Sequence, residues 1–212
     1  MTPLETRNAR LAEKLIKNLK RRNITAHYCA TASPAVELIS SMIGDGSTVT
    51  WGGSMTIHDM GLTDALRRRN TLNIIDRAQA TTPDEVRKTY IQSFEADYYL
   101  TSANAISEDG VIVNIDGNGN RIAAISWGPK RVVFVVGMNK VAQTVDAALT
   151  RARSTAAPIN AARLGTETPC NSDGCCHNCN SPASICSYVH LLRNSRFGER
   201  HIVVLVGENL GY

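Results

Sequence analysis

Hydrophobic and polar residues form two kinds of pattern along the chain, a helical period and short continuous apolar runs. Residues 5–22 place Leu11, Leu15, Ile16 and Leu19 on one face and charged residues elsewhere, which is the 3.6-residue period of an amphipathic helix. Short apolar runs typical of buried strands follow at 25–30, 47–51, 72–76, 96–101 and 131–137. Helical patterns separate or follow these runs, beginning at Ser33-Pro34 and covering His58–Arg69, Pro83–Phe94 and Asn139–Arg153. This alternation predicts an α/β fold of the Rossmann-like class, a mainly parallel sheet with flanking helices.

Residues 110–128 interrupt the alternation. They predict two extended segments joined at Asn118-Gly119, because an Asn-Gly pair favours the positive φ values of a hairpin turn. The final segment, 201–212, returns to the apolar pattern of a buried strand. Residues 1–212 are therefore expected to form one α/β domain, with a loop-rich segment at 168–188 held before the last strand.

Five of the six cysteines lie in that loop-rich segment, between residues 170 and 186. The N-terminal residues lack the apolar core of a secretory signal, so a cytoplasmic location is expected. Clustered thiols in a reducing compartment favour metal ligation over disulfides. Cys176 and Cys179 form a C-x2-C pair, a spacing typical of metal sites, and two further thiolates, Cys170 and Cys186, complete a set of four ligands.

Two questions about this metal site stay open on spacing alone. Cys175 could be a spare thiol, and His177 is an alternative fourth ligand. Four thiolates suit zinc as well as an iron–sulfur cluster, and their spacing does not separate the two.

Glycines and polar side chains gather where the predicted strands end. Gly52 and Gly53 follow one strand and precede a helix, where free backbone N–H groups and the helix dipole favour a phosphate or carboxylate. Thr56-x-x-Asp59 resembles a capping box for that helix. Lys140, after the strand at 131–137, either reaches an anion or lies in solvent. The predicted ligand-binding set is Gly52, Gly53, Ser54, Thr56, Asn114, Asp116, Asn120, Arg121, Asn139 and Lys140.

Composition narrows the classes of protein. Hydrophobic residues make up 43% of the chain and charged residues 20%, as in ordinary globular proteins. No apolar run approaches the roughly 20 residues that cross a bilayer. The net charge is only +4, and the basic runs 20–22 and 67–69 fall at the ends of predicted helices, where the dipole favours cations. No membrane span and no nucleic-acid partner are expected.

Several segments together resemble the lactate-utilisation protein family, the LUD domain, in its branch with a C-terminal cysteine motif. The resemblance is carried by WGGSMT, GVIVNIDGNGNRIAA, GPKRVVFVVGMNK, TPCNSDGCCHNCNSPASIC and VLVGENLGY, at residues 51–56, 110–124, 128–140, 168–186 and 204–212. It implies a fold similar to sugar-phosphate isomerases and coenzyme A transferases. It also implies a role beside the iron–sulfur subunits of a cytoplasmic system that oxidises L-lactate.

The cysteine pattern of the family selects Cys176 over Cys175 and makes a 4Fe–4S cluster the expected cofactor, with zinc as the alternative. Members often carry a glutamate shortly after the threonine of the glycine motif, whereas this chain has His58 and Asp59 there. A catalytic carboxylate is therefore not assigned.

Three hypotheses about function follow. In the first, the chain is a redox or accessory subunit of an L-lactate oxidoreductase system that binds a small organic acid. In the second, it is an acyl- or phosphate-transfer or isomerase-like enzyme with a structural zinc. In the third, it is a non-catalytic assembly or regulatory module. Iron–sulfur subunits and a small anion are the expected partners, and a homo-oligomer is left open.

Overall fold

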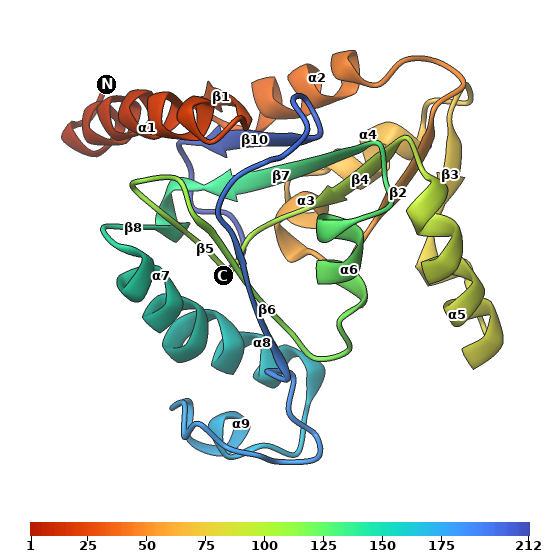
Figure 1. Ribbon diagram of the computed structural model, residues 1–212, viewed down its shortest axis with the longest axis vertical. Helices are drawn as coiled ribbons and strands as arrows, with labels where there is room; N and C mark the ends of the chain where they lie inside the picture. The colour runs from red at the N-terminus through yellow and green to blue at the C-terminus, as the bar shows by residue number, and fades with distance from the viewer.

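A six-stranded parallel sheet forms the centre of the protein. The computed structural model describes residues 1–212, and Figure 1 shows helices packed on both sides of this sheet. Its strand order is β1-β10-β7-β4-β2-β3, and every neighbouring pair is parallel. The strands are β1 (Thr25–Cys29), β2 (Thr48–Trp51), β3 (Asn73–Ile75), β4 (Tyr98–Thr101), β7 (Arg131–Gly137) and β10 (His201–Val206). The predicted α/β class with a mainly parallel sheet is confirmed.

Nine α-helices accompany the strands. They are α1 (Pro3–Arg21), α2 (Ala32–Met42), α3 (Met55–Asp59), α4 (Leu62–Arg67), α5 (Pro83–Gln92), α6 (Asn120–Ser126), α7 (Val145–Arg151), α8 (Ala157–Leu164) and α9 (Pro169–Asp173). Short 3-10 turns cover Arg77–Gln79, Ser93–Glu95 and Met138–Lys140, and a π-helical segment covers Ala152–Ala156. None of the helices has the length and apolarity needed to span a membrane.

The alternation of side chains along β7 and β10 divides the core into two layers. Phe134 and Val136 face α1 and the second sheet, where Leu15 and Leu19 of α1 pack against them. Val133 and Val135 face the opposite side, in a cluster with α2, α3 and α4. Both strands are buried along nearly their whole length, as parallel strands covered by helices on both faces must be.

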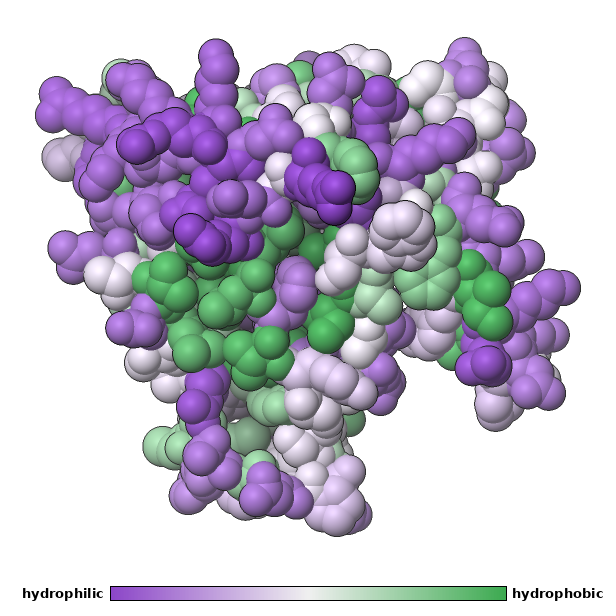
Figure 2. Space-filling view, viewed as in Figure 1, coloured by the Kyte–Doolittle hydropathy of each residue, from purple (hydrophilic) through white to green (hydrophobic).

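A second sheet lies beside the first, with the strand order β8-β5-β6-β9. It consists of β5 (Ala105–Ser107), β6 (Ile112–Asp116), β8 (Val141–Ala142) and β9 (Tyr188–Leu192). β9 is an edge strand, and its Val189 and Leu191 are 53% and 46% exposed. Figure 2 shows apolar side chains gathered near the middle of the face that β9 crosses in Figure 1. Such a patch on an edge strand is typical of a contact with another protein.

The predicted hairpin over residues 110–128 is wrong in its second half, which is helix α6. Gly119 does have a positive φ, of 78°, but it caps the helix rather than turning a hairpin. Asp116 decides the outcome, because its carboxylate accepts the backbone N–H groups of Asn118, Gly119 and Ile122 at 3.2, 3.2 and 3.3 Å. A carboxylate that satisfies the free N–H groups at a helix start stabilises the helix. β6 pairs instead with β5 and β9.

The helix predicted over Asn139–Arg153 begins later than its sequence suggested. Residues after β7 form a 3-10 turn and the short strand β8, and α7 begins only at Val145. Its cap is Thr144, whose Oγ1 accepts the backbone N–H of Ala147 at 3.1 Å. The capping box predicted at Thr56-x-x-Asp59 is also absent, because Ser54 occupies the cap position and Thr56 lies inside α3.

Replacing Thr144 with alanine is expected to lower the free energy of unfolding by about 1 kcal/mol, because the first turn of α7 loses its side-chain acceptor. Urea denaturation of the variant would measure this. Thr150→Ala is the matched control, since Thr150 is exposed near the end of the same helix. Equal losses in the two variants would contradict the assignment of Thr144 as the cap.

Candidate functional site

A cavity of about 480 Å³ opens at the carboxyl ends of β2 and β4. The loop after β2 supplies Gly52, Gly53 and Ser54, and the loop after β4 supplies Ser102 and Asn104. Loops that follow β6 and β7, together with α8 and the C-terminal residue, close its other sides. Ligands of open parallel sheets bind at this edge, because chain connections diverge there and leave a crevice.

Eight of the ten residues predicted to bind a ligand line this cavity: Gly52, Gly53, Ser54, Thr56, Asp116, Asn120, Arg121 and Lys140. Asn114 and Asn139 do not. Asn114 is fully buried in β6, and neither polar atom of its side chain has a hydrogen-bond partner. Asn139 holds the C-terminal tail, since its amide group donates to Gly211 O at 3.3 Å and accepts from Leu210 N at 3.2 Å.

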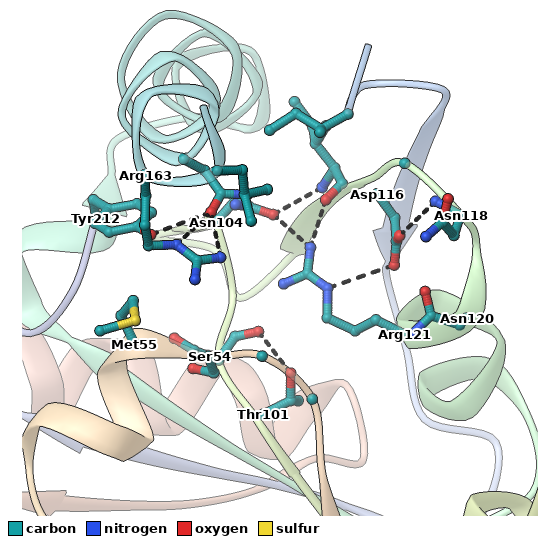
Figure 3. A pocket seen from close by; sticks show the side chains of 18 of the residues that line it. Ser54, Met55, Thr101, Asn104, Asp116, Asn118, Asn120, Arg121, Arg163 and Tyr212 are labelled. Carbon is teal, nitrogen blue, oxygen red and sulfur yellow. Dashed lines mark hydrogen bonds and ion pairs between the residues drawn. The ribbon is translucent and has the colours of Figure 1, made fainter. Parts of the chain in front are cut away.

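Positive charge dominates the cavity. Three arginines, Arg77, Arg121 and Arg163, and the amine of Lys140 line it, against one acidic side chain, Asp116. Only Arg121 has a carboxylate partner, since its Nε lies 3.6 Å from Asp116 Oδ2. Figure 3 shows Arg163 and Arg121 on opposite sides of the cavity, with Ser54 and Met55 below them. An excess of cations in a concave, partly desolvated site favours an anionic ligand.

Arg121 is held in place while part of its guanidinium stays available. One amino group donates to Asn104 Oδ1 at 2.8 Å and to Ile115 O at 2.5 Å. The other amino group makes no hydrogen bond within the chain and projects into the cavity in Figure 3. A fixed guanidinium with free donors is the group best suited to bind a carboxylate or phosphate.

Lys140 lies at the bottom of the site and not in solvent. Its side chain is 2% exposed, and its Nζ donates to Thr56 Oγ1 at 2.8 Å and to Ser102 Oγ at 3.0 Å. Burial and, to a smaller extent, the positive charges of Arg151 and Arg121 together lower the pKa of this amine to about 7. A substantial fraction of the Lys140 side chain is therefore uncharged at neutral pH.

The cysteine segment borders the same cavity. Residues 182–185, directly before Cys186, line it, and Gly117 lets them approach closely. A Cβ on Gly117 would lie 3.2 Å from the Cα of Ile185. Two further contacts hold the segment: Ser181 Oγ donates to Glu167 O at 3.0 Å, and Arg153 donates to the side chain of Asn178.

Three thiols of this segment act on a fourth, that of Cys186. The pKa of the Cys186 thiol is raised first by burial and then by the charges of Cys176, Cys170 and Cys179. Cys175 is not among these neighbours. His177 is engaged elsewhere, with its Nε2 2.6 Å from Asp173 Oδ2.

Four soft thiolates from one exposed segment are a donor set that fits an iron–sulfur cluster or zinc. In this structure no three His, Cys, Asp or Glu side chains converge closely enough to hold a metal ion.

Comparison with known families decides the membership of the chain, because the LUD domain matches residues 12–206. The chain belongs to the LUD domain family. This family is associated in general with lactate utilisation. No curated protein matches the sequence.

Two solved structures are similar in shape to this LUD protein. A DUF162 family protein from Deinococcus radiodurans is 15% identical, with a TM-score of 0.54, and the match covers 94% of this chain and 97% of that one. The eIF2B delta protein from Chaetomium thermophilum is 14% identical, with a TM-score of 0.38, and the match covers 66% and 57%. The first similarity supports the fold along nearly the whole LUD domain.

Several lining residues of this LUD domain were not predicted from the sequence. They are Arg77, Ser102, Asn104, Arg163 and Tyr212. Ser102 and Asn104 follow the strand at 96–101, so the strand-end rule that found Gly52 could have found them as well. Arg163 and Tyr212 come from a helix and from the chain terminus, and only the folded arrangement brings them to the cavity.

Proposed function

We propose that this LUD protein is a subunit of a lactate-oxidising system that binds a small organic carboxylate in its cationic cavity. The observation that carries the proposal is the position of residues 182–185, which line the cavity and lead directly into Cys186. Anion site and thiol group are thus parts of one continuous structure. The apolar residues of edge strand β9 support contact with a partner subunit, for which the family suggests iron–sulfur proteins.

The residues that would hold an iron–sulfur cluster, of the 4Fe–4S type, are Cys170, Cys176, Cys179 and Cys186. Such a group, when bound, supplies one-electron transfer. The protein itself contributes the anion site. Arg121 has free donors for the carboxylate, Ser54 and Asn104 line the same cavity, and Arg163 faces Arg121 across it. A cation on each side favours an anionic ligand such as a hydroxy acid.

The transfer-enzyme alternative is less well supported. It requires a carboxylate nucleophile in the cavity, and the only carboxylate there is Asp116. That side chain accepts three backbone N–H groups at the start of α6. Glu108, near the end of β5, forms an ion pair with Lys14 at 2.7 Å and does not line the cavity.

Two measurements on anaerobically purified protein test the proposal. Iron and acid-labile sulfide in comparable amounts, with the visible absorption of a cluster, are expected. Isothermal titration with L-lactate should show saturable binding that weakens as salt is added, because an ionic contact is screened. Zinc without sulfide would favour the structural-zinc alternative, and absence of carboxylate binding would remove the anion site from the proposal.

An Arg121→Met variant is expected to bind the carboxylate about 10- to 100-fold more weakly, because a charged hydrogen bond contributes about 1.5–3 kcal/mol. Arg87→Met is the matched control, since Arg87 is exposed on α5 and does not line the cavity. Calorimetric affinities for wild type and both variants decide the matter. Equal affinities in all three proteins would show that Arg121 does not contact the ligand.

A further inference from the structure

One buried amine in the cavity has no role in carboxylate binding alone. Lys140 is 2% exposed, yet no carboxylate forms an ion pair with it. Its Nζ contacts two hydroxyl groups, those of Thr56 and Ser102, which line the same cavity. The charges that lower its pKa, those of Arg151 and Arg121, are both positive. A lysine buried among cations and hydroxyls is a costly arrangement that is typical of functional sites.

Resting on the anion site proposed above, we propose that Lys140 Nζ forms an imine with the carbonyl carbon of a bound 2-oxo acid. The two halves of the cavity select this class of ligand. Arg121 has free donors for a carboxylate, and the amine requires a neighbouring electrophilic carbonyl. A 2-oxo acid carries these two groups on adjacent carbons, and it is the product class formed when a 2-hydroxy acid is oxidised.

The step is a condensation without oxidation or reduction. The nitrogen lone pair of the uncharged amine attacks the carbonyl carbon and forms the C–N bond. The C–O bond then breaks, and the oxygen leaves as water with the two protons that the nitrogen carried. The resulting imine can take up one proton on nitrogen. Thr56 and Ser102 hold the amine by accepting its N–H groups, which leaves its lone pair for the carbonyl.

The surroundings of Lys140 also make it more reactive towards a carbonyl group than the surface lysines. The pKa of Lys140, lowered by burial to about 7, leaves roughly half or more of its amines uncharged at pH 7.5. An exposed lysine with an ordinary pKa near 10.4 is uncharged in only about one molecule in a thousand at that pH. Lys130, whose side chain is 75% exposed, serves as the surface lysine for comparison.

The test is reductive trapping of the imine. The intact, anaerobically purified protein is incubated at pH 7.5 with pyruvate and cyanoborohydride, and the adduct is located by peptide mass spectrometry. One adduct per chain at Lys140 is expected. Lys140→Arg should lose it, and Lys130→Arg should keep it. An adduct spread over the surface lysines, or one unchanged in Lys140→Arg, would overturn the proposal.

Lactate binding and the wild-type peptide map test the imine separately from the anion site on which it rests. L-lactate has no carbonyl group, so its binding tests the anion site alone. Lactate binding without a pyruvate adduct at Lys140 would overturn the imine and leave the anion site standing. The wild-type peptide map decides the question even if Lys140→Arg fails to fold, because absence of the adduct in the wild-type protein is itself contrary to the proposal.

Discussion

Cys176→Ser is expected to lose nearly all the iron and acid-labile sulfide of the purified protein, whereas Cys175→Ser is expected to keep both. The two thiols are adjacent in sequence, so a difference between them must come from the direction in which each side chain points. Cys176, with Cys170 and Cys179, acts on the thiol of Cys186, and Cys175 does not. Removing one of four thiolate ligands opens the coordination shell, because serine is a poor ligand for iron.

The pair of variants is its own control, since both replace one exposed thiol with a hydroxyl in the same loop. Iron and sulfide analysis with the visible absorption spectrum measures the outcome. Folding is checked by far-UV circular dichroism, which should be unchanged because neither residue lies in the core. Retention of the cluster in Cys176→Ser together with its loss in Cys175→Ser would reverse the assignment.

A zinc site would give a related but distinguishable result. Cys176→Ser would then release zinc without any change in sulfide, because no sulfide was present. The same variants therefore distinguish the two cofactors as well as the two thiols.

The main sheet could be predicted from sequence because its strands are continuous apolar runs. Residues 131–137 and the apolar residues that begin at His201 became β7 and β10, both buried on two faces. Such runs have few alternatives in a chain of this composition. The amphipathic period of residues 5–22 likewise became α1, with Leu15 and Leu19 in the core.

The hairpin predicted for residues 110–128 was wrong because a turn signal and a helix-capping signal compete there. Asn118-Gly119 is a strong hairpin signal, but Asp116 lies three residues before Gly119 and can accept several backbone N–H groups at once. The side-chain acceptor makes the glycine a helix cap. The Asn-Gly pair alone therefore predicts a hairpin, whereas the pair together with Asp116 favours a helix start.

The candidate site was predictable where it follows strand ends and unpredictable where it depends on long-range packing. Gly52 and Arg121 were found by their positions. The burial of Lys140 was not, because it depends on Thr56 and Ser102, which lie 84 and 38 residues away in sequence. The contact between Gly117 and Ile185, which brings the cysteine segment to the cavity, also joins distant parts of the chain.

The buried amine should leave a signature in the pH dependence of stability. Its pKa is lowered to about 7 in the folded protein from an ordinary value of 10.5. Between these values the unfolded chain binds a proton that the folded chain does not, so the free energy of unfolding rises with pH. The stabilisation is complete above the unfolded pKa and is lost as pH falls towards 7. The slope is about 1.4 kcal/mol per pH unit.

Lys140→Met is expected to remove that slope, because methionine has a similar length and does not titrate. The unfolding free energy of the wild type should gain about 2–3 kcal/mol on the variant between pH 7 and pH 9. Urea denaturation of both proteins, with equal metal content, measures the difference. Other groups whose pKa changes on folding, such as the Cys29 thiol with a pKa raised by burial, affect both proteins and cancel. Parallel curves for the two proteins would mean that Lys140 is charged in the folded state and cannot act as a free amine near neutral pH.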